Sequence, residues 1–96
     1  MIRREGERLV LSGAVTLGNV AQLLDEGRRY VDEGVRSVDL GEVTELDSAL
    51  LALLLAWLRH AKGKRVELSF LNLPEALRTI ARLYGVEALL PLASQN

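Results

Sequence analysis

The sequence predicts a single α/β domain over residues 1–96, a sandwich with a central mixed β-sheet and helices packed on it, in the order β-β-α-β-α-β-α. Three observations predict this class. The chain has 96 residues, and one compact domain commonly has about 50–200. Short apolar runs alternate with longer segments of helical periodicity. The links between them are short, which favours parallel strands joined by right-handed helical crossovers.

The first third of the chain predicts two short strands and a helix. Residues 9–11 form an apolar run that predicts a buried strand, and Ser12-Gly13 behind it is typical of a turn. Residues 14–16 could pair back as a second short strand. Residues 17–33 carry apolar side chains at helical spacing, and Gly34 is a suitable C-terminal cap because glycine adopts the left-handed conformation easily.

The predicted helix at residues 17–33 contains Gly27, which costs up to about 1 kcal/mol relative to alanine. Close packing on the sheet would be one reason to keep a glycine there. Residues 35–40, rich in β-branched side chains, predict the next strand. Residues 41–46 are polar and predict a connection.

A second helix is expected to run to about residue 62, where Gly63 stops it. Asp47 or Ser48 is its N-cap, because either side-chain oxygen can accept a hydrogen bond from an unpaired first-turn amide. Residues 64–71 show the clearest alternation of apolar and polar side chains in the chain, which predicts a strand.

A last helix begins at Pro74 and ends at Gly85. One of its faces is expected to be apolar, with Leu73, Leu77, Ile80 and Tyr84. Residues 86–92 are expected to fold back as a short strand or turn.

Composition excludes several functional classes. Twelve Lys and Arg against thirteen Asp and Glu give a net charge of −1, so no strong field attracts nucleic acid or an anionic membrane. There is no cysteine, and one histidine cannot form a multi-histidine metal centre within one chain. The longest apolar run has ten residues, whereas a spanning helix needs roughly 20. We therefore expect a soluble, cytoplasmic, non-catalytic protein without metal or cofactor.

The most informative segment for function is Asp47-Ser48-Ala49-Leu50-Leu51, at the start of a helix that follows a strand and loop. Unpaired amides and the positive end of the helix dipole converge there, which suits an acceptor, a phosphate or a polar group of a partner. The alternative is that Asp47 and Ser48 only cap the helix.

The helix after this segment is apolar on nearly every side. Such a helix is either enclosed by its own domain or covered by a partner, and the sequence leaves both open. The basic residues that follow are best explained as a solvated edge with favourable charge at a helix C-terminus. They are Arg59, His60, Lys62, Lys64 and Arg65.

Residues 46–50, Leu-Asp-Ser-Ala-Leu, make the chain resemble a STAS domain, the fold of anti-sigma-factor antagonists and of cytoplasmic domains of sulfate transporters. The resemblance covers nearly the whole chain and includes Ser12-Gly13 and the Val38-Asp39-Leu40 strand. Asp47, Ser48, Ala49 and Leu51 match the family's signature, whereas Leu50 stands where glycine is usual.

Two branches of that family are candidates. The residues at 12–16, the leucine-rich helix and residues 77–90 resemble the small STAS subunit of the Mla phospholipid ABC transporter, also called toluene-tolerance proteins. The alternative is an anti-sigma-factor antagonist whose signature serine, here Ser48, is phosphorylated by the kinase that is also the anti-sigma factor. The acidic pair that this branch carries after its first strand is missing here.

The first resemblance implies a cytoplasmic subunit that binds and supports the transporter's ATPase, in a system that maintains outer-membrane lipid asymmetry. We expect the contact at Asp47, Ser48, Ala49, Leu50 and Leu51, with a hydrogen bond from Ser48 and apolar burial of Leu50 and Leu51. A third function, binding of a small molecule, would require a pocket near Ser48.

Overall fold

The computed structural model describes residues 1–92, and its element order confirms the predicted α/β class. In chain order the elements are β1 (Ile2–Glu5), β2 (Arg8–Val15), α1 (Val20–Asp32), β3 (Ser37–Leu46), α2 (Ser48–Gly63), β4 (Ser69–Leu71), α3 (Glu75–Leu83) and the 3-10 turn η1 (Glu87–Leu89). The sheet has the order β1-β2-β3-β4.

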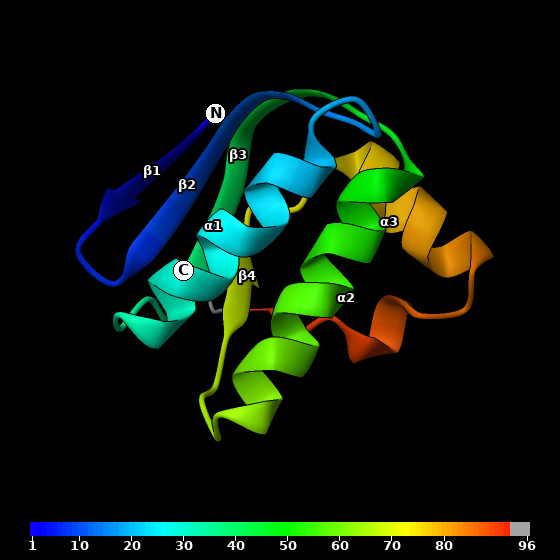
Figure 1. The fold of residues 1–96 in the computed structure, drawn as a ribbon. Helices are drawn as coiled ribbons and strands as arrows, with labels where there is room; N and C mark the ends of the chain where they lie inside the picture. Colours follow the sequence, from blue (N-terminus) through cyan, green and yellow to red (C-terminus); the bar gives the residue numbers. More distant parts are fainter. Residues whose placement is uncertain (93–96) are drawn as a thin grey trace.

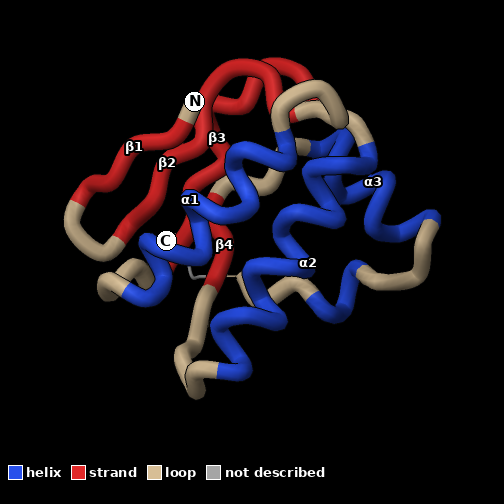
Figure 2. Tube along the Cα trace, viewed as in Figure 1, coloured by secondary structure: helices blue, strands red, loops and turns tan. Residues whose placement is uncertain are grey.

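The sheet is mixed, as predicted. β1 pairs antiparallel with β2, whereas β2–β3 and β3–β4 are parallel, each joined through a helix. Figure 1 shows α1 and α2 side by side in front of the sheet, with α3 beyond α2. The connections that follow β2 and β3 emerge at one end of the sheet, where α1 and α2 begin (Figure 2). This end therefore carries the start of α2 and the connection into α1.

The hydrophobic core lies between the sheet and the helices, and most of α2 belongs to it. Trp57 of α2 is fully buried, and its indole Nε1 donates to the carbonyl oxygen of Leu24 on α1 at 3.0 Å. Gly27 of α1 faces the same indole, so the close approach expected at this glycine is to Trp57 and not to the sheet. The other fully buried large side chains include Leu9, Leu11, Leu40, Leu50, Leu53, Leu54, Phe70 and Leu77.

The first two strands differ from those predicted. Residues 9–11 and 14–16 do not form separate strands, because β2 runs through Ser12-Gly13, where a turn was expected. Gly13 has a φ of +75°, and the pairing of β2 with β3 shifts register beside it. The glycine thus accommodates an irregularity within one continuous strand. The antiparallel partner of β2 is β1, and the charged residues of β1 did not predict a strand.

Two further boundaries were wrong. Residues 41–46, expected to be a polar connection, extend β3 and pair with β2. The strand predicted at residues 64–71 forms a ladder only at Ser69–Leu71, because its partner in β3 begins at Ser37. Tyr84, expected on the buried face of the last helix, is 65% exposed.

The segment after α3 returns to the edge of β4, as predicted for residues 86–92. The amide of Phe70 donates to the carbonyl oxygen of Pro91 at 2.8 Å, and Leu92 forms a parallel bridge with Phe70. Leu90 is 6% exposed and joins the core. Within residues 1–92, no helix has the length and apolar character needed to cross a membrane.

Candidate functional site

Asp47 connects the start of α2 to the connection between β2 and α1. Its Oδ1 accepts from the amide of Ala49 at 2.8 Å, which makes it the N-cap of α2. Its Oδ2 accepts from the amide of Leu17 at 3.1 Å. One carboxylate therefore satisfies two backbone donors on segments thirty residues apart in the sequence, and it fixes the position of Leu17 beside the first turn of α2.

Ser48 is the first residue of α2, and its side chain is exposed. Among the hydrogen bonds that join residues 1–92, none involves the Ser48 hydroxyl. Because Asp47 and not Ser48 caps the helix, the hydroxyl is accessible to another molecule. Of the two N-cap candidates in the sequence, Asp47 and Ser48, Asp47 is therefore the one that caps the helix.

The leucines after Ser48 do not lie on the surface. Leu50 is 0% exposed and Leu51 is 4% exposed, and both belong to the core of the domain. The expectation that they supply apolar area to a partner is therefore wrong. The physical reason is that this turn of α2 packs on its own sheet and on α3, so the domain encloses these side chains itself. Ala49 is half-buried.

Other segments place exposed apolar side chains near the start of α2 instead. Leu17, which Asp47 fixes beside the helix start, is 78% exposed, and Tyr84 after α3 is 65% exposed. Tyr84 and Ser48 line a shallow hollow of about 280 Å³ together with Ala52 and Val86. We call Leu17, Asp47, Ser48, Ala52 and Tyr84 the Ser48 surface. Sequence reasoning missed Leu17 and Tyr84 because burial patterns within one element do not show which elements meet, whereas helical spacing from Ser48 could have found Ala52 on the same face of α2.

The basic residues at the C-terminal end of α2 and just after it form two sets. His60 Nε2 lies 2.8 Å from Asp32 Oδ1 on α1, and Lys64 Nζ lies 4.0 Å from the same atom. Arg59, Lys62 and Arg65 form no ion pair with any residue between 1 and 92. The basic cluster predicted as one solvated edge is thus partly a link between α1 and α2. No cluster of metal-binding side chains occurs in the described part of the chain.

A separate polar cluster lies where β3 meets the loop after β4. Asp39 Oδ1 accepts from the Gly41 amide at 2.9 Å and from the Asn72 side chain at 3.0 Å, and Arg8 lies 3.4 Å from Oδ2. Partial burial alone would raise the pKa of Asp39, but these hydrogen bonds to Asn72, Gly41 and Arg8 outweigh it, and the pKa is lowered. The cluster joins β2, β3 and the loop after β4, and it does not include Ser48.

Comparison with known proteins identifies related sequences and folds. The family model described as "Mlab, STAS domain" matches residues 1–91. No curated protein matches the chain.

Three solved structures show the similarity of fold. A chain of the Acinetobacter MlaFEDB complex in its ATP-bound Vtrans2 conformation is 26% identical, with a TM-score of 0.78, and the match covers 92% of this chain and 95% of that chain. The unphosphorylated anti-sigma factor antagonist SpoIIAA is 15% identical, with a TM-score of 0.73 over 99% of this chain and 88% of that chain. A putative anti-sigma factor antagonist from Thermotoga maritima is 11% identical, with a TM-score of 0.75 over 99% and 86%.

Proposed function

Because this chain belongs to the STAS domain family of the Mlab type, we propose that it is a non-catalytic subunit of a phospholipid ABC transporter of the Mla type. As such a subunit, it binds and supports the transporter's ATPase. In this function it is cytoplasmic and peripheral to the inner membrane through the transporter, whose activity maintains outer-membrane lipid asymmetry. The likeness to a chain of the Acinetobacter MlaFEDB complex supports this choice of partner.

The observation that carries the proposal is the exposed Ser48 hydroxyl beside the exposed Tyr84, with the exposed Leu17 held next to Asp47. Leu17 and Tyr84 present apolar area to solvent, and burying a large apolar side chain contributes roughly 1.5–3 kcal/mol. A hydroxyl within such an area makes the contact specific, because a hydrogen-bond donor that is buried in the complex needs an acceptor on the partner. Asp47 positions both parts, since it holds Leu17 and the first turn of α2 together.

The geometry changes the set of residues that we propose at the contact. Ser48, Asp47 and Ala49 remain at the proposed contact, and Leu17, Ala52 and Tyr84 join them. Leu50 and Leu51 lie beneath it, where they support the first turn of α2 from within the core. The hollow of about 280 Å³ beside Ser48 is below the ~300–1,000 Å³ of small-molecule pockets, which favours a protein contact over a ligand site here.

The first prediction concerns Ser48→Arg. A long charged side chain at the centre of the Ser48 surface prevents close packing, so we expect loss of ATPase capture by at least about tenfold, since leaving a charge buried and unpaired costs several kcal/mol. Because Ser48 is exposed, the melting temperature should stay within a few degrees of the wild type. The measurement is co-purification with the transporter ATPase, followed by thermal unfolding of each variant alone.

A matched control places the arginine at the opposite end of the sheet. Glu7 lies in the exposed turn between β1 and β2, so Glu7→Arg should leave capture unchanged. Undiminished capture by a folded Ser48→Arg protein would contradict the proposed contact.

The alternative function is an anti-sigma factor antagonist that a kinase switches by phosphorylating Ser48. The accessible hydroxyl supports it, and several antagonists share the fold. A phosphate would add about −1.5 to −2 charges directly beside the Asp47 carboxylate. Incubation with the anti-sigma factor kinase and ATP, followed by mass spectrometry, distinguishes the two functions: stoichiometric phosphate on Ser48 favours the antagonist.

A further inference from the structure

A second and larger cavity lies at the other end of α2 from Ser48. It is a groove of about 1210 Å³ between the C-terminal half of α2, the chain leading into β4, and the segment around η1. Its apolar lining includes Leu55 and Leu58 of α2, Val66 before β4, and Leu89 and Pro91. Its size is comparable to the upper end of small-molecule pockets, about 1,000 Å³.

The groove carries an excess of positive charge. Arg36, Arg59, Lys62 and Arg65 line it with a single acidic side chain, Glu67. None of these four cations takes part in an ion pair between residues 1–92, although Arg3, Arg4 and Arg8 at the β1 side are each paired. Arg36 is held in place because it donates to the carbonyl oxygen of Val35 at 2.9 Å. A protein of net charge −1 therefore concentrates uncompensated positive charge at one apolar groove.

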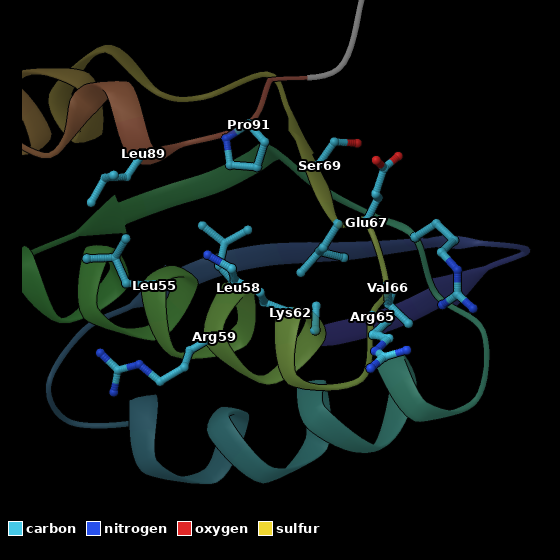
Figure 3. A pocket seen from close by; sticks show the side chains of 13 residues that line it. Leu55, Leu58, Arg59, Lys62, Arg65, Val66, Glu67, Ser69, Leu89 and Pro91 are labelled. Carbon is cyan, nitrogen blue, oxygen red and sulfur yellow. The ribbon is translucent and has the colours of Figure 1, made fainter.

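Apolar side chains form a wall along the groove, and cations lie beside it. Figure 3 shows Leu55 and Leu89 toward one end, where Arg59 also extends, Leu58 and Lys62 in the middle, and Arg65 with Val66 and Glu67 toward the other end. On α2, Leu55 and Leu58 are followed by Arg59 and Lys62. The groove thus combines an apolar wall with cations along its length.

We propose that this groove binds a single-chain anionic amphiphile, with its head group at Lys62, Arg65 and Arg36 and its alkyl chain along Leu58 toward Leu55 and Leu89. Guanidinium groups match carboxylate and phosphate oxygens in geometry and charge. The alkyl chain gains from leaving water, roughly 0.8 kcal/mol per buried CH₂. Leu55 lines both this groove and the hollow beside Ser48, so the two sites adjoin, but the proposed binding does not rest on the function proposed for the Ser48 surface.

The charge distribution disfavours a second copy of the chain as the occupant. Symmetric association through this groove would bring Arg59, Lys62 and Arg65 toward the same residues of the other copy, and like charges repel at such a contact. An acidic segment of a partner protein would also satisfy the charges, but the apolar wall that Leu58, Leu55 and Leu89 form beside the cations favours a molecule that carries an alkyl chain.

The test titrates laurate and dodecyl phosphate, each below its critical micelle concentration, into the ¹⁵N-labelled protein and follows the backbone amide shifts. We expect saturable one-site binding, with shifts confined to the second half of α2, residues 65–69 and residues 89–91. Dodecyl maltoside lacks the charge and inorganic phosphate lacks the alkyl chain, so we expect each to bind with an affinity at least about tenfold lower. The two amphiphiles together show whether the head group must be a carboxylate or a phosphate.

Paired variants locate the site. Lys62→Glu combined with Arg65→Glu reverses two exposed cations at the head-group site and should weaken binding by about tenfold or more. The control, Arg28→Glu combined with Arg29→Glu, changes the net charge equally on α1, outside the groove, and should leave binding unchanged. Near the alkyl chain, Leu89→Glu should weaken binding, whereas Leu83→Glu, on an exposed leucine outside the groove, should not.

Three results would overturn the proposal: no saturable binding of either amphiphile, equal affinity for the charge-reversed protein whose melting temperature is unchanged, or shifts centred on Ser48. Binding of a twelve-residue peptide of alternating glutamate and leucine in this groove, without binding of either amphiphile, would also overturn it and would identify an acidic protein segment as the occupant.

Discussion

Gly27 fixes how closely α1 and α2 approach. A β-carbon at this position would overlap Cε2, Cζ2 and Nε1 of the Trp57 indole, the largest buried side chain of the core. The same indole donates to the Leu24 carbonyl oxygen, which holds the ring in one orientation and leaves it little freedom to move. The intrinsic helix penalty of glycine is therefore offset by the contact that its missing side chain permits.

We predict that Gly27→Ala destabilises the protein by about 1–3 kcal/mol or more, because the added methyl group forces the indole or the helix to shift. Alanine is the better helix former, so a model based on propensity alone gives the opposite sign. Urea unfolding of the two proteins measures the difference.

Gly63, the last residue of α2, provides the comparison. No atom lies within 4 Å of a β-carbon built there, so Gly63→Ala should be neutral or stabilising by up to about 1 kcal/mol. Equal effects of the two substitutions would show that Trp57 does not restrict position 27.

The strands illustrate what a sequence pattern can and cannot predict. Residues 66–70 alternate as expected, with Leu68 and Phe70 buried and Glu67 exposed, yet only Ser69–Leu71 pair with β3. Alternation reports which face of the chain is buried, whereas pairing depends on where the neighbouring strand begins. For the same reason, residues 41–46 gave no signal: their side chains are mostly exposed, and β2 holds their backbone.

The candidate site was predictable in part. The Asp47 cap follows from residue type and position, because few side chains satisfy a first-turn amide. The burial of Leu50 and Leu51 could not be predicted, because a helix that is apolar on all sides does not show which of its faces meets the core. Tyr84 meets Ser48, and Leu17 meets Asp47, only through the arrangement of α2, α3 and the connection after β2.

The Asp39 cluster makes strand pairing at β3 sensitive to acid. Hydrogen bonds lower the pKa of Asp39 in the folded protein, so its contribution to stability is present above the unfolded pKa of about 3.9 and is lost as the pH falls through the folded value. The side-chain amide that Asp39→Asn introduces does not titrate in this range. We therefore predict that the stability gap between wild type and Asp39→Asn is largest near neutral pH and narrows in acid.

The measurement is urea unfolding of both proteins at several pH values between about 2 and 7, where Asp and Glu titrate. Glu42 is present in both proteins; the hydrogen bond from Arg3 lowers its pKa and the charge of Asp39 raises it, so the difference reports Asp39 together with its effect on Glu42. A gap that stays constant with pH would contradict the role assigned to this carboxylate.

The end of the described chain closes the domain at the edge that the sheet leaves open. After α3, the chain crosses to β4, where Pro91 accepts from Phe70 and Leu92 bridges to it. An uncovered edge strand invites pairing with other chains, and this segment covers part of that edge. The fold therefore depends on a contact between residues far apart in the sequence, which local patterns do not reveal.

Two adjacent leucines test this closure. Leu90 is 6% exposed and Leu89 is 61% exposed. Leu90→Ala should destabilise the protein by about 2–5 kcal/mol, because it leaves a cavity where the returning segment meets the core. Leu89→Ala should change stability by no more than about 0.5 kcal/mol. Equal losses in thermal or urea unfolding would contradict the burial on which the closure depends.

The two-sided contact of Asp47 has a consequence for recognition. Because its carboxylate holds the first turn of α2 against Leu17, the surface around Ser48 is a discontinuous epitope, assembled from three stretches of chain only in the native state. A synthetic fragment carrying residues 46–51 alone would lack Leu17 and Tyr84 and would be a poor competitor for whatever recognises the intact domain.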